Sequence, residues 1–313
     1  MAAHKPVADA LGRRLAEFTD DPDAFAQALA AGLVGLADPV YLEGSHRIVP
    51  GLGPTYGVRW PLTAAIERGF REATRKTGTS GFLALAARLF GEPQLEPRWF
   101  AFGLLGRILP DDGERAWQLL RRAAREAGDW ATVDTLAHPV GRGIILESYR
   151  WAELDGLVFS PSRWERRLVG STVATLPFID HRAGRTQDVV RHGLDLVDEL
   201  IGDNEADVQK ALAWALRSLT LVDRDAVLAF VERQTDIAAV TGDGNRAWVL
   251  RDALVKLPPD AAARIRQRLD GIRRRPNGPS TSRAAATAAR FAHASDPARY
   301  PAQDPAPRGD ARP

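Results

Sequence analysis

The chain of 313 residues contains no cysteine and only six histidines. The absence of thiols excludes disulfides, zinc fingers, iron–sulfur ligation and thiol nucleophiles. The histidines show no metal-ligand spacing, since even the closest pair, His181 and His192, lies eleven residues apart. Phosphate-loop, HExxH and GxSxG patterns are also missing, and GLGPTYG at 51–57 does not fit a dinucleotide-binding fingerprint. We therefore expect neither a metal nor a cofactor.

Long apolar runs are missing as well. The first residues, MAAHKPVADALGRRLAEF, include no apolar run of signal-peptide length. No later segment approaches the ~18 consecutive apolar residues of a membrane span. We expect a cytoplasmic protein that has no membrane partner.

Charge of one sign is not in large excess, because 42 Lys or Arg face 40 Asp or Glu. This balance argues against a uniformly cationic nucleic-acid binder. The distribution along the chain is uneven, however. Residues 246–275 contain nine Arg or Lys against three Asp, whereas the segment EFTDDPDAFAQ at 17–27 is acidic. This asymmetry predicts one basic face suited to a polyanion.

Apolar residues recur at helical spacing almost everywhere, with no sustained strand alternation, which predicts an all-α protein. Short breakers such as LPDDGE, GDNE and LPPD separate the helices and place acids where they can cap the next one. The predicted helices span roughly residues 6–18, 22–36, 60–76, 79–90, 95–109, 112–127, 129–136, 139–150, 161–176, 186–201, 205–220, 223–235, 245–256 and 259–274.

The predicted helices also pair. Trp99, Trp130 and Trp164 begin successive units about 31 and 34 residues apart, and further units open near Asp207 and Arg246. This spacing is typical of two-helix HEAT-like repeats, which stack into a curved solenoid. We expect residues 1–275 to form one such domain, with a concave face lined by the second helix of each pair. A surface of that kind binds a long partner.

Two regions fall outside the repeats. Residues 41–61, YLEGSHRIVPGLGPTYGVRWP, are rich in Gly and Pro, which predicts an irregular or hairpin-like insertion near the concave face. The tail at 276–313 contains seven prolines, and we expect it to be disordered apart from a short helix around 283–294.

A tryptophan and an aspartate stand four positions apart in GDWATVDTL at 128–136, so Trp130 and Asp134 leave the predicted helix by the same face. A core Trp beside a solvated acid is the ordinary explanation of such a pair. The same spacing recurs in Trp151 with Asp155 and in Trp248 with Asp252. Spacing alone therefore does not single out one pair.

The order of the segments along the chain and the residues around each pair do single out Trp130 with Asp134, because three segments together resemble one family. They are GDWATVDTLAHPVGRGI at 128–144, SPSRWERRLVGS at 160–171 and DVQKALAWALRSL at 207–219. The trio is similar to the HEAT-repeat alkylpurine DNA glycosylases, the AlkD type of DNA alkylation repair enzyme. The resemblance runs from about residue 56 to 275, and YGVRWPLTAAIERGFREA is similar to that family's amino-terminal helix entry.

The resemblance implies a catalytic carboxylate at Asp134, a cleft lined by Trp130 and Trp214, and an arginine at the DNA backbone at Arg167. It implies hydrolysis of the N-glycosidic bond of purines alkylated at N3 or N7 in duplex DNA, without deep flipping of the lesion. The cationic base needs no general acid to leave, so the carboxylate is left to stabilise the oxocarbenium-like sugar and to orient water. The sequence departs from the family at Ala213, where Gly usually precedes the Trp.

Further polar residues suit the same partner. Lys210, Trp214 and Arg217 share a helix face at spacings of four and three, which favours phosphate contacts along a DNA backbone. Tyr56, in the insertion, is expected to reach the cleft. We expect a monomer that binds duplex DNA carrying alkylated purines and that is associated with the nucleoid when bound.

Two other functions stay open. One is a non-catalytic HEAT-like module that binds unusual DNA structures or a protein partner. The other is a specialised glycosylase for bulky adducts at guanine N7, of the self-resistance type, with the 41–61 insertion shaping the lesion side. Since no residue is nominated as a lyase nucleophile, the glycosylase predicted here is monofunctional.

Overall fold

The computed structural model describes residues 4–292, and all regular structure in that part of the chain is helical. This confirms the predicted all-α class. The helices are α1 (His4–Leu15), α2 (Pro22–Leu36), α3 (Pro39–Ile48), α4 (Trp60–Ala73), α5 (Phe82–Leu89), α6 (Leu95–Ile108), α7 (Gly113–Glu126), α8 (Trp130–Leu146), α9 (Trp151–Leu157), α10 (Arg163–Ile179), α11 (Gln187–Leu200), α12 (Ala206–Leu219), α13 (Arg224–Thr241), α14 (Gly244–Ala253), α15 (Pro259–Arg268) and α16 (Arg283–Ala292).

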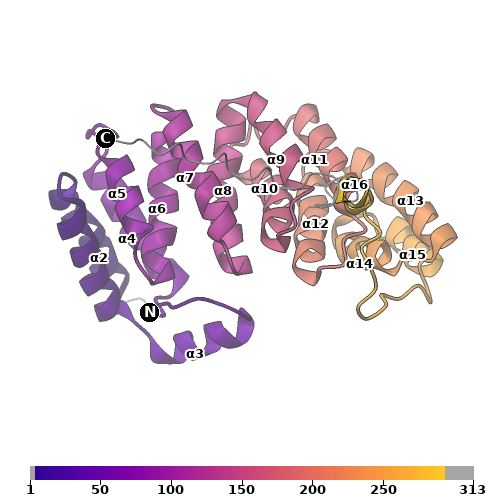
Figure 1. Ribbon diagram of the computed structural model, residues 1–313, viewed down its shortest axis with the longest axis horizontal. Coiled ribbons are helices and arrows are strands. Elements are labelled where there is room, and N and C mark those ends of the chain that lie inside the picture. The colour runs from indigo at the N-terminus through magenta and orange to yellow at the C-terminus, as the bar shows by residue number, and fades with distance from the viewer. Residues whose placement is uncertain (1–3, 293–313) are drawn as a thin grey trace, which may run out of the picture.

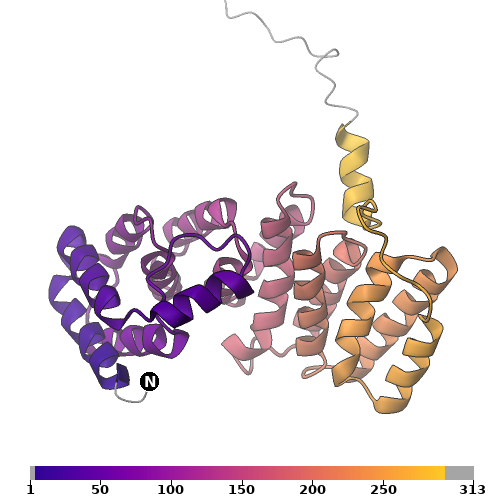
Figure 2. The same ribbon diagram turned by 90° about the horizontal axis from the view of Figure 1, so that it is seen from below.

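The helices follow one another in a curved two-layer array, as expected for HEAT-like repeats (Figures 1 and 2). One layer consists of α4, α6, α8, α10, α12 and α14, and from α6 onward each of its helices packs on the next. We call it the inner layer. The residues expected to open the repeats, from Trp99 to Arg246, all lie on these inner helices, so the sequence spacing of about 31 to 34 marks the step from one to the next.

The central inner helix α10 packs closely on both of its neighbours. α10 packs extensively on both α8 and α12. Gly170 of α10 faces Ala211 of α12 so closely that a Cβ added at Gly170 would lie 2.9 Å from the Ala211 Cβ. A larger residue would push α10 away from α12. Gly170, in the sequence VGS at 169–171, therefore allows the two helices to pack this closely.

One inner helix is longer than predicted. The sequence suggested a break between 136 and 139, whereas α8 runs without interruption from Trp130 to Leu146 with Pro139 inside it. Proline inside a helix loses one backbone hydrogen bond. Its ring is buried and packs beside Gly106 of α6, where a Cβ would lie 3.6 Å from the Pro139 Cβ. Packing between helices thus overrides the local break signal.

The 41–61 insertion also differs from the prediction, because its first part is the helix α3 and not an irregular hairpin. Asp38 starts α3 by accepting hydrogen bonds from the backbone N–H groups of Val40 and Tyr41. The segment 49–59 then returns to α4. The buried Glu96 of α6 holds that return by accepting three backbone N–H bonds, from residues 56, 57 and 58. In Figure 1, α3 lies below the amino-terminal half of the array.

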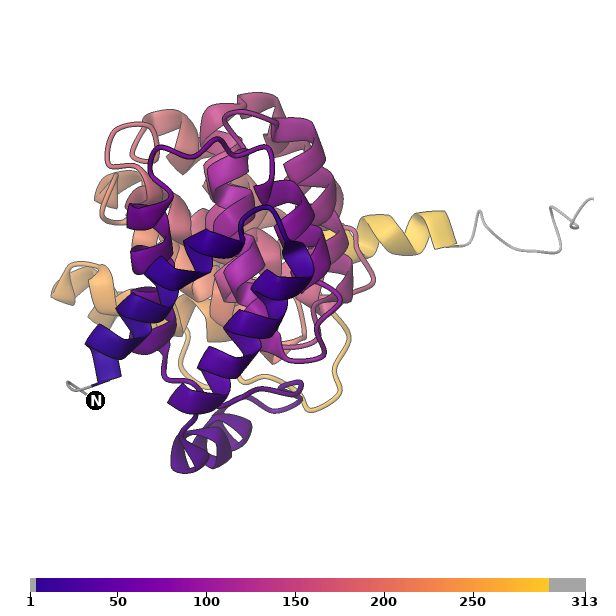
Figure 3. The same cartoon turned by 90° about the vertical axis from the view of Figure 1, so that its left-hand side faces the viewer.

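No single helix among residues 4–292 is long and apolar enough to cross a membrane. The pair α2 and α3 meets the length and composition criteria only when joined, and it bends by 96° between the two helices. Phe25, Leu29 and Leu33 of α2 are buried in the protein core, where α2 packs on α5 and α6. Figure 3 shows this end of the array facing the viewer.

Residues 277–282 belong to the tail for which disorder was expected, yet this segment packs on the domain. Thr281 donates its backbone N–H to the Gly202 carbonyl at 2.8 Å, and its hydroxyl donates to Asp243 at 2.7 Å. Arg283, which begins α16, pairs with Asp198 of α11 at 2.8 Å. The expected helix around 283–294 is present as α16 to residue 292, and the rest of the tail lies outside the described residues.

The predicted basic face at 246–275 is only partly available, because several of its cations are used within the protein. Arg246 is buried and bonds Asp243 and Gln234. Arg251 donates to the backbone carbonyls of residues 269 and 272. Their charges secure α14 and the loop after α15, and they leave fewer free cations than the sequence count indicated.

Candidate active site

The amino terminus of α8 positions the first aromatic residue of the site. Asp129 caps the helix by accepting the Thr132 N–H at 2.8 Å and the Thr132 hydroxyl at 2.7 Å. The Trp99 indole N–H of α6 donates to the same hydroxyl at 3.0 Å. Since Asp129 and Thr132 are both buried, this network fixes the first turn of α8, which begins with Trp130.

One turn further along α8, the Asp134 carboxylate receives three hydrogen bonds from α10. Arg167 donates through Nε to Oδ1 at 3.1 Å and through Nη2 to Oδ2 at 2.7 Å, which is a two-pronged ion pair. Ser171 donates its hydroxyl to Oδ1 at 2.6 Å. The Asp134 side chain is 22% exposed. A carboxylate offers about four lone-pair positions, so one stays open on the solvent side.

Arg167 joins three inner helices at this point. Its remaining terminal nitrogen donates to the Asp207 carbonyl of α12 at 2.6 Å, and its guanidinium carbon lies 5.8 Å from the centre of the Trp130 ring. Its side chain is only 6% exposed. These hydrogen bonds therefore favour a structural role for Arg167 over the expected contact with a DNA phosphate. In this structure Arg167 orients Asp134.

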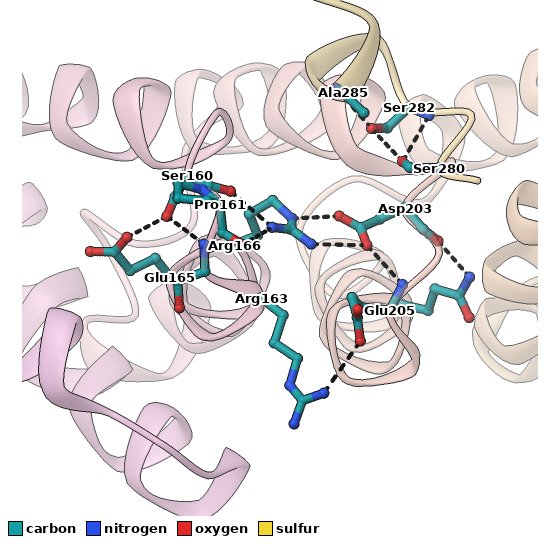
Figure 4. Close-up of polar contacts among 12 residues, drawn as sticks. Ser160, Pro161, Arg163, Glu165, Arg166, Asp203, Glu205, Ser280, Ser282 and Ala285 are labelled. Atoms are coloured by element: carbon teal, nitrogen blue, oxygen red, sulfur yellow. Dashed lines mark hydrogen bonds and ion pairs between the residues drawn. The ribbon is translucent and has the colours of Figure 1, made fainter. Parts of the chain in front are cut away.

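The neighbouring arginine anchors the start of α10. Arg166 donates to the buried Asp203 at 2.6 Å and to the Ser160 carbonyl at 2.8 Å, while Arg163 faces Glu205 at 3.5 Å (Figure 4). These bonds tie the first turn of α10 to the loop before α12. They fix the helix that carries Arg167 and Ser171.

Trp214 lies on α12, so α10 separates it from Trp130 and Asp134 on α8. Its indole is partly buried and packs against the core. Ala213 is completely buried, so its Cβ fills the helix interface and does not narrow an open cleft beside the indole. Lys210, one turn before Trp214, is exposed, and no ion pair joins it to another described residue. It is placed to meet a polyanion.

Two predicted DNA contacts are not supported by the geometry. Arg217 is paired with Asp252 of α14 at 2.6 Å, and its charge connects neighbouring repeats. Tyr56 packs against the core, and burial, followed by the charges of Glu92 and Glu96, raises the pKa of its phenol. Tyr56 does not line the cavity that α3 forms, although Thr55 and Gly57 do.

That cavity has a volume of about 380 Å³ and lies between α3 and the first turns of α4, α6 and α8. Four aromatic side chains line it: Tyr41, Trp60, Trp99 and Trp130. Trp60 is 52% exposed. Trp130 therefore belongs both to this aromatic cavity and to the surroundings of Asp134.

Sequence reasoning missed Ser171, although its position four residues after Arg167 places the two on one helix face. It also missed His138, which follows Asp134 by one turn of α8. Burial lowers the pKa of the His138 imidazole, and the Asp134 carboxylate opposes that shift. At neutral pH His138 is therefore mostly uncharged. Within the described part of the chain, no cluster of three or more His, Asp or Glu side chains is arranged to hold a metal ion.

These features define a class of protein: an all-α solenoid of HEAT-like helix pairs whose inner helices present a carboxylate held by an arginine. A family model described as DNA alkylation repair enzyme matches residues 29–257, and the chain belongs to that family. The matched region contains Trp130, Asp134, Arg167 and Trp214. Membership makes DNA the partner and alkylation repair the general role. No curated protein matches the chain.

Proposed function

We propose that the protein is a monofunctional DNA glycosylase that hydrolyses the N-glycosidic bond of N3- or N7-alkylated purines in duplex DNA. The observation that carries the proposal is the Asp134 carboxylate, which is oriented by Arg167 and Ser171 and still reaches solvent. We also propose that the protein acts as a monomer on DNA in the cytoplasm.

The reaction needs one negative charge in a fixed position. An alkylated purine already carries positive charge and leaves as a neutral base, so no acid has to protonate it. As the bond breaks, positive charge develops on the deoxyribose. Asp134 stabilises that charge and orients the attacking water through its open lone-pair position. Trp130 and Trp214 present electron-rich ring faces to the cationic nucleotide.

Arg167 and Ser171 act as positioning residues in this proposal. The two-pronged pair and the hydroxyl hold the carboxylate in one orientation before DNA binds, so little reorganisation is needed during the reaction. The lesion is proposed to stay within a shallow cleft, without deep flipping.

We propose that the substrates include bulky adducts at guanine N7. The support is the aromatic cavity beside Trp130, with its four aromatic side chains and its volume of about 380 Å³. A planar adduct gains stacking and apolar contact there, whereas a methyl group does not reach it. Figure 2 shows α3, one wall of this cavity, as a separate helix in front of the array.

The test is release of free base from duplex DNA that carries N7-methylguanine, N3-methyladenine or a bulky N7 adduct. We expect release by the wild-type protein and not by Asp134→Asn, which keeps the shape and removes the charge. Asp155→Asn is the matched control, because Asp155 also follows a tryptophan by four positions. The proposed role of Asp134 is contradicted if Asp134→Asn and Asp155→Asn lose base release equally, or if both variants release base as fast as the wild-type protein.

The second candidate is a non-catalytic module that binds DNA structures or a protein. The observation that favours it is the same ion pair, since Arg167 and Asp134 also link α8 to α10 as a purely structural contact does. Tight binding of adducted duplex without base release, by the wild-type protein and Asp134→Asn alike, would select this function.

A further inference from the structure

A second cavity lies on the inner helices, away from the aromatic cavity of α3. Its volume is about 350 Å³, and it is lined by residues of α4, α6 and α8 and by Ile179 of α10. Phe70, Phe100 and Phe102 form apolar walls. Cavities that bind small ligands occupy about 300–1,000 Å³ and combine apolar walls with a few polar groups. This cavity is at the small end of that range.

One carboxyl lines the cavity without a partner. Glu67 of α4 lies against Gly103 of α6, with its carboxyl carbon 3.6 Å from the position that a Gly103 Cβ would take. No hydrogen bond or ion pair joins this carboxyl to another residue in the described part of the chain. Burial raises the pKa of Glu67 to about 7, against the opposing charge of Arg71. Glu67 is half-buried, and its unpaired carboxyl is open to a ligand that supplies hydrogen-bond donors from the cavity.

Two cations line the same cavity. Arg71 of α4 and Arg142 of α8 are exposed, and neither forms an ion pair with an acid among the described residues. Arg107 is different, because it donates to the hydroxyl and the carbonyl of Thr74 and stacks over Phe82. Arg71 and Arg142 are therefore free to hold an anionic group, whereas Arg107 is part of the wall.

The donors that fit Glu67 identify the ligand. An ionised carboxylate accepts two parallel hydrogen bonds, so it pairs with an edge that carries two adjacent N–H donors. Guanine presents such an edge through N1–H and the N2 amino group. Adenine and cytosine each place an acceptor beside their amino group, and thymine places its single N–H between two carbonyls. The apolar walls suit a planar ring, and the two free arginines suit a phosphate.

We propose that this cavity is a guanine-nucleotide site, in which Glu67 binds the N1–H and N2 amino donors and Arg71 and Arg142 bind the phosphate. The ligand is either a free nucleotide or an unpaired guanine of a DNA strand. His138 lines this cavity and follows Asp134 by one turn of α8, whereas Asp134 does not line it, so the site adjoins the catalytic carboxylate without including it. The site goes beyond the proposed glycosylase, and its binding does not depend on base release.

The first experiment is calorimetric titration of the full chain at pH 8, where Glu67 is ionised, with GMP, IMP and AMP. IMP lacks the N2 amino group, and AMP lacks the N1–H donor. Because one hydrogen bond to a charged group contributes about 1.5–3 kcal/mol, we expect IMP and AMP to bind at least about 10-fold more weakly than GMP. Equal affinities for GMP and AMP overturn the proposal.

Two variants separate the base contact from the phosphate contact. Glu67→Gln is expected to weaken GMP at least about 10-fold, because an amide offers one acceptor and one mismatched donor. Glu72→Gln, on the same helix but outside the cavity, is the matched control and keeps wild-type affinity. Arg142→Ala is expected to weaken GMP and to leave guanosine, which has no phosphate, unchanged. If Glu67→Gln binds GMP as the wild-type protein does, the assignment is wrong.

The second experiment distinguishes the two sources of guanine. Binding is compared for a duplex with one unpaired guanine and for the same duplex with one unpaired adenine. A preference for guanine that Glu67→Gln removes identifies a DNA strand as the source, whereas GMP binding without that preference identifies a free nucleotide. If neither GMP nor the unpaired guanine is preferred, the cavity is not a guanine site.

Discussion

At the scale of single residues, the proposed chemistry depends on how tightly one carboxylate is held. Asp134 has three donors on α10, of which the Ser171 hydroxyl is the shortest contact at 2.6 Å. Ser171 is completely buried and its hydroxyl points at Asp134. It therefore orients the carboxylate without contacting DNA.

We predict that Ser171→Ala lowers kcat for base release about 10-fold and leaves KM for the duplex unchanged. The reason is that loss of a hydrogen bond to a charged group costs about 1.5–3 kcal/mol in the oriented state, while the DNA-facing surface is untouched. Single-turnover release from N7-methylguanine duplex measures the effect. A rise in KM with constant kcat would assign Ser171 to DNA binding instead.

A second residue-scale prediction concerns Glu67 and pH. Its pKa is near 7 in the folded protein against 4.5 as the ordinary value, so the folded state holds the proton more tightly than the unfolded state. Stability therefore falls as pH rises from 4.5 to about 7. We predict that Glu67→Gln is more stable than wild type at pH 8, by about 1–3 kcal/mol at about 1.4 kcal/mol per pKa unit, and nearly equal at pH 5.

Urea unfolding at the two pH values checks this prediction. Glu72→Gln, which lies on the same helix and is exposed, controls for the loss of one negative charge. A variant that gains nothing between pH 5 and pH 8 would mean that the Glu67 carboxyl is solvated or paired in solution.

At the scale of helices and loops, the segment 49–59 depends on a single acid. The buried Glu96 accepts three backbone N–H groups of that segment, and no other side chain of the described residues bonds them. Removing it leaves buried donors without partners, each of which costs about 1–3 kcal/mol. The segment also forms part of the aromatic cavity.

We predict that Glu96→Ala lowers the free energy of unfolding by about 2–4 kcal/mol. It should also slow release of a bulky N7 adduct more than release of N7-methylguanine, because α3 and the loop after it shape only the cavity. The ratio of the two release rates, at a temperature where the variant is folded, is the measurement. An unchanged ratio of the two release rates would mean that the aromatic cavity does not determine which adducts are released.

Most helices could be predicted from the sequence, because apolar periodicity and capping acids act locally. Asp129, Asp223 and Asp243, for example, cap the helices that follow them. The failures have tertiary causes. The ring of Pro139 packs beside Gly106 on another helix. The Gly- and Pro-rich composition of 41–61 indicates a loop, whereas Asp38 and Pro39, which start α3, lie just before that stretch.

The site was only partly predictable for a similar reason. The spacing of Trp130 and Asp134 gave their common face, and the family resemblance singled them out. The sequence could not show that Arg167 turns toward Asp134 and that Arg217 turns toward Asp252, because both contacts join residues more than 30 positions apart. An arginine on a helix face looks the same whether its partner is a phosphate or a carboxylate.

At the scale of the whole molecule, DNA binding rests on the cations that the fold leaves free. Lys210 is exposed, whereas Arg217 on the same helix is paired with Asp252. We predict that Lys210→Ala weakens binding to all duplexes alike and reduces the slope of log K against log salt by about 0.9, as expected for the loss of one phosphate contact.

Arg217→Ala is the matched comparison for that measurement. It removes a contact between neighbouring repeats, so it should lower the unfolding temperature and leave the salt slope unchanged. If Arg217→Ala alone changes the slope, the pairing with Asp252 gives way to a phosphate when DNA binds.

The most direct test of the central claim is the single-turnover rate of free-base release from a duplex with one N7-methylguanine, measured for wild type and Asp134→Asn at equal, saturating binding. Removal of a single electrostatic contact of this kind typically lowers rates about 10²–10³-fold, and we predict a loss at least that large while duplex affinity stays within about 3-fold. Release by Asp134→Asn at the wild-type rate would contradict the account.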